Sequence, residues 1–160
     1  MGSVCLLGRS GRGGGCSSLV GQHAALLRGR LCDVGRVEDA RCMWQQLTCG
    51  RVGVMHAGGV LQDALLARQS MRRLRLVGAP KLGGVATLYS GAHANVLAWS
   101  MLFSSVAALL GNAGQINYAA ANALLDAAAD VRRAGGCSTV RVQWAARRGG
   151  GMAEAAVHEA

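Results

Sequence analysis

Residues Trp99–Arg133 read WSMLFSSVAALLGNAGQINYAAANALLDAAADVRR, a short apolar run followed by a glycine-containing turn and a long alanine-rich segment. The apolar run Trp99–Phe103 predicts a buried strand, and the spacing of residues within Gln115–Arg133 predicts a helix. The small residues of this helix would let it pack closely against a sheet. The predicted buried stripe of the helix consists of Ile116, Ala120, Ala123, Leu124, Ala127 and Val131.

Short apolar runs alternate with helical segments over the rest of the chain as well. Further strands are predicted at Val4–Leu7, Arg30–Val34, Val52–His56 and Thr139–Trp144. Further helices are predicted at Ser18–Arg28, Val37–Leu47, Asp63–Leu76 and Lys81–Ser90. This alternation is typical of parallel strands joined by right-handed crossovers. We therefore expect the α/β class, with a Rossmann-like doubly wound parallel sheet in one domain over residues 1–153 and a short tail at 154–160.

The composition favours a folded protein that does not enter a membrane. At 160 residues, 51% of them hydrophobic, the chain suits one domain with a buried core. The longest apolar-looking run, Ala98–Leu110, has 13 residues interrupted by serines, whereas a membrane-spanning helix needs about 20. We expect a cytoplasmic protein. The first 32 residues contain four arginines and no acid, so a transit segment for an organelle such as a plastid is the alternative.

The net charge of +9 raises the question of a nucleic-acid partner. Only Arg72, Arg73 and Arg75 form a tight cluster, and aromatic residues make up 4% of the chain. Without a base-stacking array we predict no nucleic-acid partner; a basic rim facing an acidic protein or a phosphorylated cofactor is favoured. The six cysteines lack metal-ligand spacing, so we expect no metal site.

Four polar residues have a spacing that suits carbonyl chemistry. Ser105, Tyr118 and Asn122 are 13 and 4 residues apart, and Lys81 lies 24 residues before the serine. Tyr118 and Asn122 would project from one face of the predicted helix, because four residues turn a helix by about 400°. A phenol, an amine and a hydroxyl that meet at a carbonyl group are the equipment for reducing a ketone.

The region after the first predicted strand is rich in glycine but does not match the dinucleotide-binding pattern G-x-G-x-x-G, because Cys16 stands where the last glycine should be. The better interpretation makes Val4–Leu7 the second strand of the fold, with Arg9 and Ser10 at its carboxyl end. A guanidinium and a hydroxyl there would suit a ribose 2′-phosphate and favour NADPH. A solvated arginine in a turn is an equally good interpretation of Arg9.

Further candidate cofactor residues follow the next two predicted strands. They are Asp33, Val34, His56, Ala57 and Gly58. Asp33 would contact the adenine side of the cofactor, or else cap the helix that starts near Val37. Gly58 would let the backbone pass close to the cofactor; an ordinary strand-to-helix turn is the alternative.

These residues lie in segments that together resemble the ketoreductase domain of modular polyketide synthases and animal-type fatty acid synthases, within the short-chain dehydrogenase/reductase superfamily. The matching segments run from Ser3 to Ala153 and are LLGRSG, CDV, GVMHAGGVLQDALL, APKLGG, LFSSVAALLGNAGQINYAAANALLDA and GGGMA. In this family the lysine lies upstream and an asparagine follows four residues after the tyrosine. Lys81 and Asn122 are similar to that arrangement.

The resemblance implies a mechanism and a setting. Tyr118 would donate a proton to the β-keto oxygen while NADPH delivers hydride to the carbon. Lys81 would lower the pKa of the tyrosine, Ser105 would bind the carbonyl oxygen, and Asn122 would hold the lysine or a water. The implied substrate is a β-ketoacyl thioester carried on the phosphopantetheine arm of an acyl carrier protein. The implied partners are that carrier protein and the neighbouring domains of a synthase.

The resemblance also bears on stereochemistry. Asp63, in the sequence Leu61-Gln62-Asp63, resembles the last position of the Leu-Asp-Asp signature of B-type reductases. Leu110 stands where A-type members carry a tryptophan. Both residues favour B-type stereochemistry, with a D-configured 3-hydroxyl group, although Gln62 departs from the signature.

Two parts of the family's pattern are not evident in the sequence. If Val4–Leu7 is the second strand, the first strand and its glycine loop are missing, and the C-terminal lid helix and last strand are missing as well. Because the first strand is central in the superfamily, its absence would separate the sheet into two blocks or force its neighbours to pair. This leaves a second hypothesis for function, a catalytically inactive remnant that serves as a structural or carrier-protein-docking module.

Overall fold

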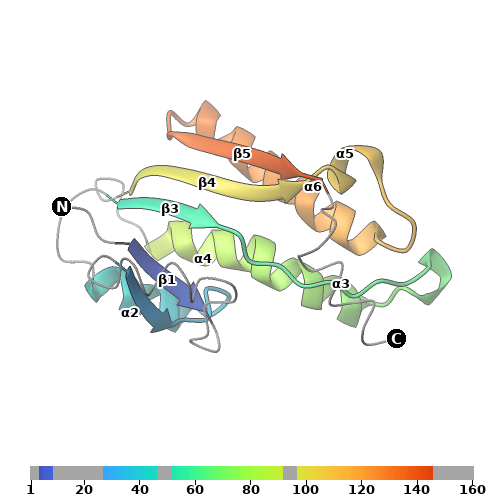
Figure 1. The fold of residues 1–160 in the computed structure, drawn as a ribbon, viewed down its shortest axis with the longest axis horizontal. Helices are drawn as coiled ribbons and strands as arrows, with labels where there is room; N and C mark the ends of the chain where they lie inside the picture. Colours follow the sequence, from blue (N-terminus) through green and yellow to red (C-terminus); the bar gives the residue numbers. More distant parts are fainter. Residues whose placement is uncertain (1–3, 9–26, 47–51, 92–96, 146–160) are drawn as a thin grey trace.

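The computed structural model describes residues 4–8, 27–46, 52–91 and 97–145 (Figure 1). The strands are β1 (Val4–Gly8), β2 (Leu27–Leu31), β3 (Val52–His56), β4 (Leu97–Ser105) and β5 (Thr139–Trp144). The helices are α2 (Val37–Gln46), α3 (Met71–Gly78), α4 (Gly84–Gly91), α5 (Ala107–Leu110) and α6 (Ile116–Ala134). A 3₁₀ turn spans Leu66–Arg68, and a π-helical turn, Ala79–Gly83, joins α3 to α4.

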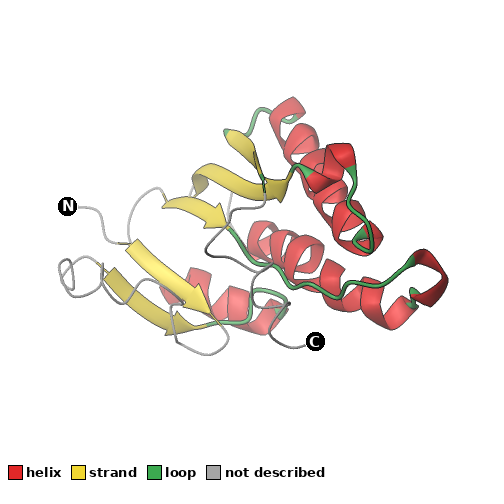
Figure 2. Ribbon diagram, turned by 45° about the vertical axis from the view of Figure 1, so that its right-hand side comes forward, coloured by secondary structure: helices red, strands yellow, loops and turns green. Residues whose placement is uncertain are grey.

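All strand pairs among these residues are parallel, which confirms the α/β class and the Rossmann-like arrangement. β1 pairs with β2, and β4 lies between β3 and β5. Within the described ranges no strand pairing joins the first sheet to the second. Of the two alternatives for the sheet, separation into two blocks is therefore the one observed, and Figure 2 shows the strands as two groups with helices alongside.

The second strand begins and ends earlier than the sequence predicts. β2 starts at Leu27 instead of Arg30, and residues 32–36 form a turn before α2. The carbonyl oxygen of Asp33 accepts from the N–H of Arg36 at 2.8 Å, and its carboxylate accepts from the N–H of Gly35 at 3.0 Å. These bonds favour a turn over extended backbone. The helix predicted at Ser18–Arg28 is wrong at Leu27 and Arg28; residues 18–26 lie outside the described ranges.

The helix predicted at Asp63–Leu76 is divided in the structure. Its first half contains only the short 3₁₀ turn, and the main chain is extended again at Gln69. Ser70 then caps α3, because its hydroxyl accepts from the N–H of Arg73 at 3.3 Å. The side-chain Nε2 of Gln69 donates to the carbonyl oxygen of Ala64 at 2.9 Å and so closes the segment between these two residues into a loop. A capping serine inside an apolar pattern thus starts the helix later than the pattern predicts.

Helix α4 contributes to two hydrophobic clusters among the described residues. Leu88 packs with Cys32, Met43 and Trp44 of the first block. The second cluster consists of Val85, Leu102, Leu125 and Ala129. The indole N–H of Trp44 donates to the carbonyl oxygen of Leu88 at 2.9 Å, which ties α2 to α4. Figure 1 shows α4 in green between the β1–β2 pair and the three-stranded sheet, so this helix connects the two blocks.

The long helix α6 buries a different face from the predicted one. All six members of the predicted stripe are exposed, including the large side chains of Ile116, Leu124 and Val131. The residues that α6 buries are Asn117, Ala121, Asn122, Leu125 and Ala129. The observed buried face is shifted by about one residue from the predicted one. It contains two asparagines, which a search for apolar residues at helical spacing does not include.

Two adjacent leucines test which face of α6 is buried. Leu125 has an exposed fraction of 0% and Leu124 of 51%. We expect Leu125→Ala to lower the free energy of unfolding by about 2–5 kcal/mol, because it removes methyl groups and leaves a cavity. Leu124→Ala should change it by less than about 0.5 kcal/mol. Urea unfolding followed by circular dichroism measures both, and equal effects of the two substitutions would contradict the observed orientation.

Candidate active site

Lys81 occupies the middle of the π-helical turn between α3 and α4. The N–H of Gly84 donates to the carbonyl oxygen of Ala79, five residues earlier, which widens the turn around the lysine. Only 3% of Lys81 is exposed. Its Nζ donates to the carbonyl oxygen of Phe103 at 3.1 Å and lies 5.6 Å from the centre of the Tyr118 ring. The turn therefore delivers one amine to the end of β4 and the start of α6.

Burial changes the acid–base behaviour of this amine. Desolvation lowers the pKa of Lys81 to about 8, while the charge of Asp126 acts in the opposite direction. At neutral pH the side chain is therefore still mainly an ammonium ion, held 5.6 Å from the centre of an aromatic ring. Lys81 is also the only lysine among the 17 basic residues of the chain. The use of lysine at this one position, where every other basic residue is an arginine, is a second feature of the sequence that singles out residue 81, in addition to its spacing from Ser105.

Tyr118 and Asn122 lie on successive turns of α6. Tyr118 is half-buried, and Asn122 has an exposed fraction of 0%. The Asn122 Nδ2 donates to the carbonyl oxygen of Tyr118 at 2.8 Å. Its Oδ1 is buried and has no hydrogen-bond partner among the described residues. A buried acceptor of this kind is available to a donor from a neighbouring group or a bound molecule.

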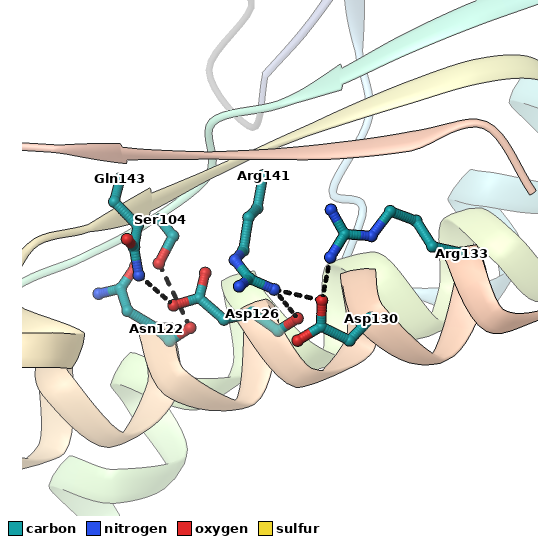
Figure 3. A network of polar contacts seen from close by, with 7 residues as sticks. All are labelled: Ser104, Asn122, Asp126, Asp130, Arg133, Arg141 and Gln143. Atoms are coloured by element: carbon teal, nitrogen blue, oxygen red, sulfur yellow. Dashed lines mark hydrogen bonds and ion pairs between the residues drawn. The ribbon is translucent and has the colours of Figure 1, made fainter.

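Ser105 ends β4 and lies in the same part of the fold. Its buried hydroxyl accepts from the N–H of Ala107 at 3.1 Å and so forms the turn into α5. The preceding Ser104 donates to the carbonyl oxygen of Asn122 at 3.4 Å, a bond that fastens α6 to β4 (Figure 3). Tyr118 contacts both Lys81, through its ring, and Asn122, through its carbonyl oxygen, and Ser105 lies two residues beyond the carbonyl group that binds Lys81.

Asn117 is a buried residue of this region that the sequence did not single out. Its Oδ1 accepts from the N–H of Tyr118 at 2.8 Å, and its Nδ2 donates to the carbonyl oxygen of Gln62 at 2.8 Å. It thereby joins the first turn of α6 to the segment after β3 and fixes the main chain of the tyrosine. Its place at the start of a predicted helix, where asparagine commonly binds free N–H groups, was the available signal.

His56, at the end of β3, supports the turn that carries Lys81. Its Nε2 donates to the carbonyl oxygen of Pro80 at 2.9 Å, and its Nδ1 is buried without a partner in the described part of the chain. Desolvation, together with the charge of Lys81, lowers the pKa of His56, which keeps the ring neutral. A Cβ atom at Gly84 would lie 2.9 Å from the Nε2 of His56, so only glycine fits there. His56 thus contacts the lysine-bearing turn directly.

The remaining candidate cofactor residues that the structure describes follow the ends of strands β2 and β3. Asp33 and Val34 form the turn after β2, where the Val34 carbonyl oxygen accepts from the Thr87 hydroxyl. The Asp33 carboxylate binds within its own turn and the carboxylate of Asp39 accepts from its N–H, so Asp33 does not cap α2 with its side chain. Ala57 and Gly58 continue from β3. Arg9 and Ser10 lie outside the described residues.

Asp63 lies beside the first turn of α6. Its carboxylate accepts from the Nε2 of Gln115 at 2.9 Å, and its carbonyl oxygen accepts from the guanidinium of Arg73 at 3.0 Å. Gln115 directly precedes α6 and lies three residues before Tyr118, so these contacts place an exposed carboxylate beside the end of α6 that carries the tyrosine. Leu110 is strongly exposed on α5.

Comparison with known proteins assigns the chain to a family. A family model described as the KR domain matches residues 4–149. The chain belongs to this family of ketoreductase domains. The resemblance inferred from the motifs is confirmed, and the match extends over both sheet blocks of the KR domain.

Several curated polyketide synthases contain a similar segment. The spectinabilin polyketide synthase system protein NorB of Streptomyces orinoci is 47% identical over 103 residues, which cover 64% of this KR domain and 5% of NorB. Mellein synthase of Phaeosphaeria nodorum is 40% identical over 102 residues, which cover 64% of this chain and 6% of that synthase. The chain thus spans only about a twentieth of the length of these relatives.

Solved ketoreductases share the fold. The ketoreductase from the first module of phoslactomycin biosynthesis in Streptomyces sp. HK803 is 34% identical with a TM-score of 0.83, and the match covers 94% of this chain and 36% of that one. The first ketoreductase of the tylosin polyketide synthase is 33% identical with a TM-score of 0.80, covering 92% and 33%. The KR domain therefore corresponds to about a third of each solved chain.

Two further properties concern the described residues alone. Within them, no group of three or more His, Cys, Asp or Glu side chains is arranged to bind a metal ion. No helix in the described ranges has the length and apolar character needed to cross a membrane.

The buried lysine predicts a pH dependence of stability. Because folding lowers the pKa of Lys81 from 10.5 to about 8, the unfolded chain binds this proton more tightly. We expect the free energy of unfolding to rise by up to roughly 3 kcal/mol between pH 8 and pH 10.5. In Lys81→Met this component should be absent, and denaturant unfolding over that pH range measures the difference between the two proteins. Parallel pH curves for both would contradict the observed burial.

Proposed function

We propose that this KR domain contributes to the NADPH-dependent reduction of a β-ketoacyl thioester to the 3-hydroxyacyl thioester. The observation that carries the proposal is the approach of the Lys81 ammonium to the ring of Tyr118, at 5.6 Å, beside a buried carboxamide. An ammonium group beside a phenol stabilises the negative charge that remains when the phenol donates its proton to a carbonyl oxygen.

The four candidate catalytic residues take distinct roles in the proposed reaction. Tyr118 is the proton donor, since its half-buried phenol is accessible to a substrate. Lys81 stabilises the tyrosinate that remains. The hydroxyl of Ser105 binds the substrate's carbonyl oxygen, and Asn122 uses its unpaired Oδ1 to hold the lysine or a water that returns the proton.

The residues present suit a nicotinamide cofactor, which supplies the hydride that the carbonyl carbon accepts. A Cβ atom added at Gly58 would lie 3.3 Å from the Nε2 of His56. Glycine has no such atom, so a cofactor can approach the main chain after β3 closely. Asp33 and Val34 would contact its adenine side, and His56, Ala57 and Gly58 would line the part nearer the substrate. Arg9 and Ser10 would bind the 2′-phosphate that distinguishes NADPH from NADH.

The polyketide synthase relatives support the proposed setting. We propose that an acyl carrier protein presents the substrate on its phosphopantetheine arm, and that neighbouring synthase domains flank this one. The net charge of +9 suits an acidic carrier protein. The alternative hypothesis, an inactive remnant with a structural or carrier-docking role, is supported by the separation of the described strands into two sheets.

The chain contains two tyrosines, which allows a matched test of the proton donor. Tyr118→Phe should lower kcat for a ketoacyl thioester surrogate by about 10²-fold or more, because it removes the proton that the reaction needs. Tyr89, whose hydroxyl donates to Ser100 at 3.0 Å, is the control. Tyr89→Phe should leave kcat within about twofold after correction for stability. NADPH oxidation measures turnover, and nucleotide fluorescence measures binding of NADPH and NADH.

The outcomes separate the two hypotheses. NADPH binding with turnover that depends on Tyr118 supports the reductase. Turnover that survives Tyr118→Phe contradicts the proposed mechanism. Binding of a carrier protein without NADPH binding or turnover favours the remnant.

Asp63 allows a test of stereochemistry. We propose B-type reduction, which gives a D-configured 3-hydroxyl group, because the Asp63 carboxylate is fixed by Gln115 immediately before α6. Asp63→Ala should lower the excess of the D product, and Asp39→Ala, which removes a carboxylate in the first turn of α2, should not. Chiral chromatography of the product measures the ratio. A predominantly L product from the unchanged protein would contradict B-type reduction.

A further inference from the structure

A third polar residue follows Tyr118 and Asn122 on the same face of α6. Asp126 comes four residues after Asn122 and eight after Tyr118, so the three lie on successive turns. Its Oδ2 accepts from the Nε2 of Gln143 on β5 at 2.7 Å (Figure 3). Its Oδ1 is buried and accepts no hydrogen bond from the described residues.

A buried carboxylate oxygen without a hydrogen-bond donor is unfavourable unless a positive charge lies near it. The charged groups around Asp126 come from three elements. On α6, Arg133 binds Asp130, and the guanidinium of Arg132 lies 3.5 Å from the centre of the Tyr89 ring. On β5, the Arg141 guanidinium binds the carboxylate of Asp130 and only the main-chain oxygen of Asp126. The third element is the π-helical turn, which packs against α6 and carries Lys81.

Lys81 is therefore the buried cation that remains for this carboxylate. Its own contacts are a neutral carbonyl oxygen and an aromatic ring. Asp126 is the group whose charge opposes the desolvation of the lysine. Among the described residues neither group has an ion-pair partner within 4.0 Å, and the packing of α6 against the π-helical turn brings the two into the same region of the fold.

We propose that Asp126 is a positioning residue for Lys81, whose buried carboxylate supplies the counter-charge that keeps the ammonium group charged and directed toward Phe103 and Tyr118. Gln143 orients the carboxylate, and the fold thus provides an acid with a buried carboxylate oxygen in addition to the four catalytic candidates. The consequence for catalysis rests on the proposed function, because it concerns the lysine that acts on Tyr118. The pairing of Asp126 with Lys81 is a property of the folded chain and is independent of turnover.

The presence of one lysine makes a direct test feasible in the full chain. Lysine labelled with ¹³C at Cε gives a single side-chain signal, and its titration midpoint reports on Lys81 alone. We expect Asp126→Asn to move this midpoint to lower pH. Asp126→Glu, which keeps the charge, should restore it at least in part. The matched control is Asp130→Asn, which removes an exposed carboxylate one turn further along α6 and should leave the midpoint unchanged.

Two results would overturn the proposal. One is a Lys81 midpoint that Asp126→Asn does not move. The other is an equal shift in Asp130→Asn, which would show a general effect of charge. If Asp126→Asn does not fold, the double variant Lys81→Met/Asp126→Asn decides: recovery of folding supports the pairing, because both charges are then gone, and failure to fold assigns Asp126 a purely structural role.

A second readout connects the pairing to catalysis. In the reductase, activity should fall at high pH as Lys81 loses its proton, and Asp126→Asn should move that decline of kcat to lower pH. A loss of packing alone would lower kcat without moving the profile. A shifted lysine signal in a protein without turnover would support the pairing and count against the proposed function, so the two failures remain distinguishable.

Discussion

The buried face of α4 is the constraint on which the rest of the structure depends. The described strands form two parallel sheets, and packing onto this helix relates one sheet to the other. Leu88 belongs to the cluster of the first block and Val85 to that of the second. Bonds from Trp44 to the Leu88 carbonyl oxygen and from Thr87 to the Val34 carbonyl oxygen complete the connection. Side-chain packing therefore holds the two groups of strands together, a role that hydrogen bonds between neighbouring strands have in a single continuous sheet.

The same helix also determines where the candidate active site forms. α4 begins directly after the π-helical turn, so the residues that anchor the two blocks also place Lys81. His56 fastens this turn to the end of β3 through Pro80, and Asn117 fastens the start of α6 to the segment after β3. The site thus stands where three segments distant in sequence converge at the carboxyl ends of parallel strands, the usual place for ligands in α/β folds.

The polar groups of the site are costly to bury, and the fold compensates for them only in part. Desolvation lowers the pKa of Lys81 to about 8 even though Asp126 acts against it. Asn122 and His56 each bury one polar atom without a partner in the described region. Unpaired buried polar atoms are rare in folded proteins and concentrate where chemistry or binding takes place. Three of the residues that bury an unpaired atom, His56, Asn122 and Asp126, lie in the segments that match the ketoreductase motifs, whereas Gln69 and Arg132 do not.

The sequence by itself determined the alternation of strands and helices, the positions of β3, β5 and α2, and the spacing that singled out Lys81, Tyr118 and Asn122. These features depend on neighbours within a few residues or on motifs. Only the tertiary structure decided that α6 buries Asn117 and Asn122 in place of Leu124, that Ser70 starts α3 late, and that α6 packs against the turn that carries Lys81. The physical reason is that hydrophobic periodicity ranks polar residues as exposed, whereas their burial is determined by partners far away in the chain.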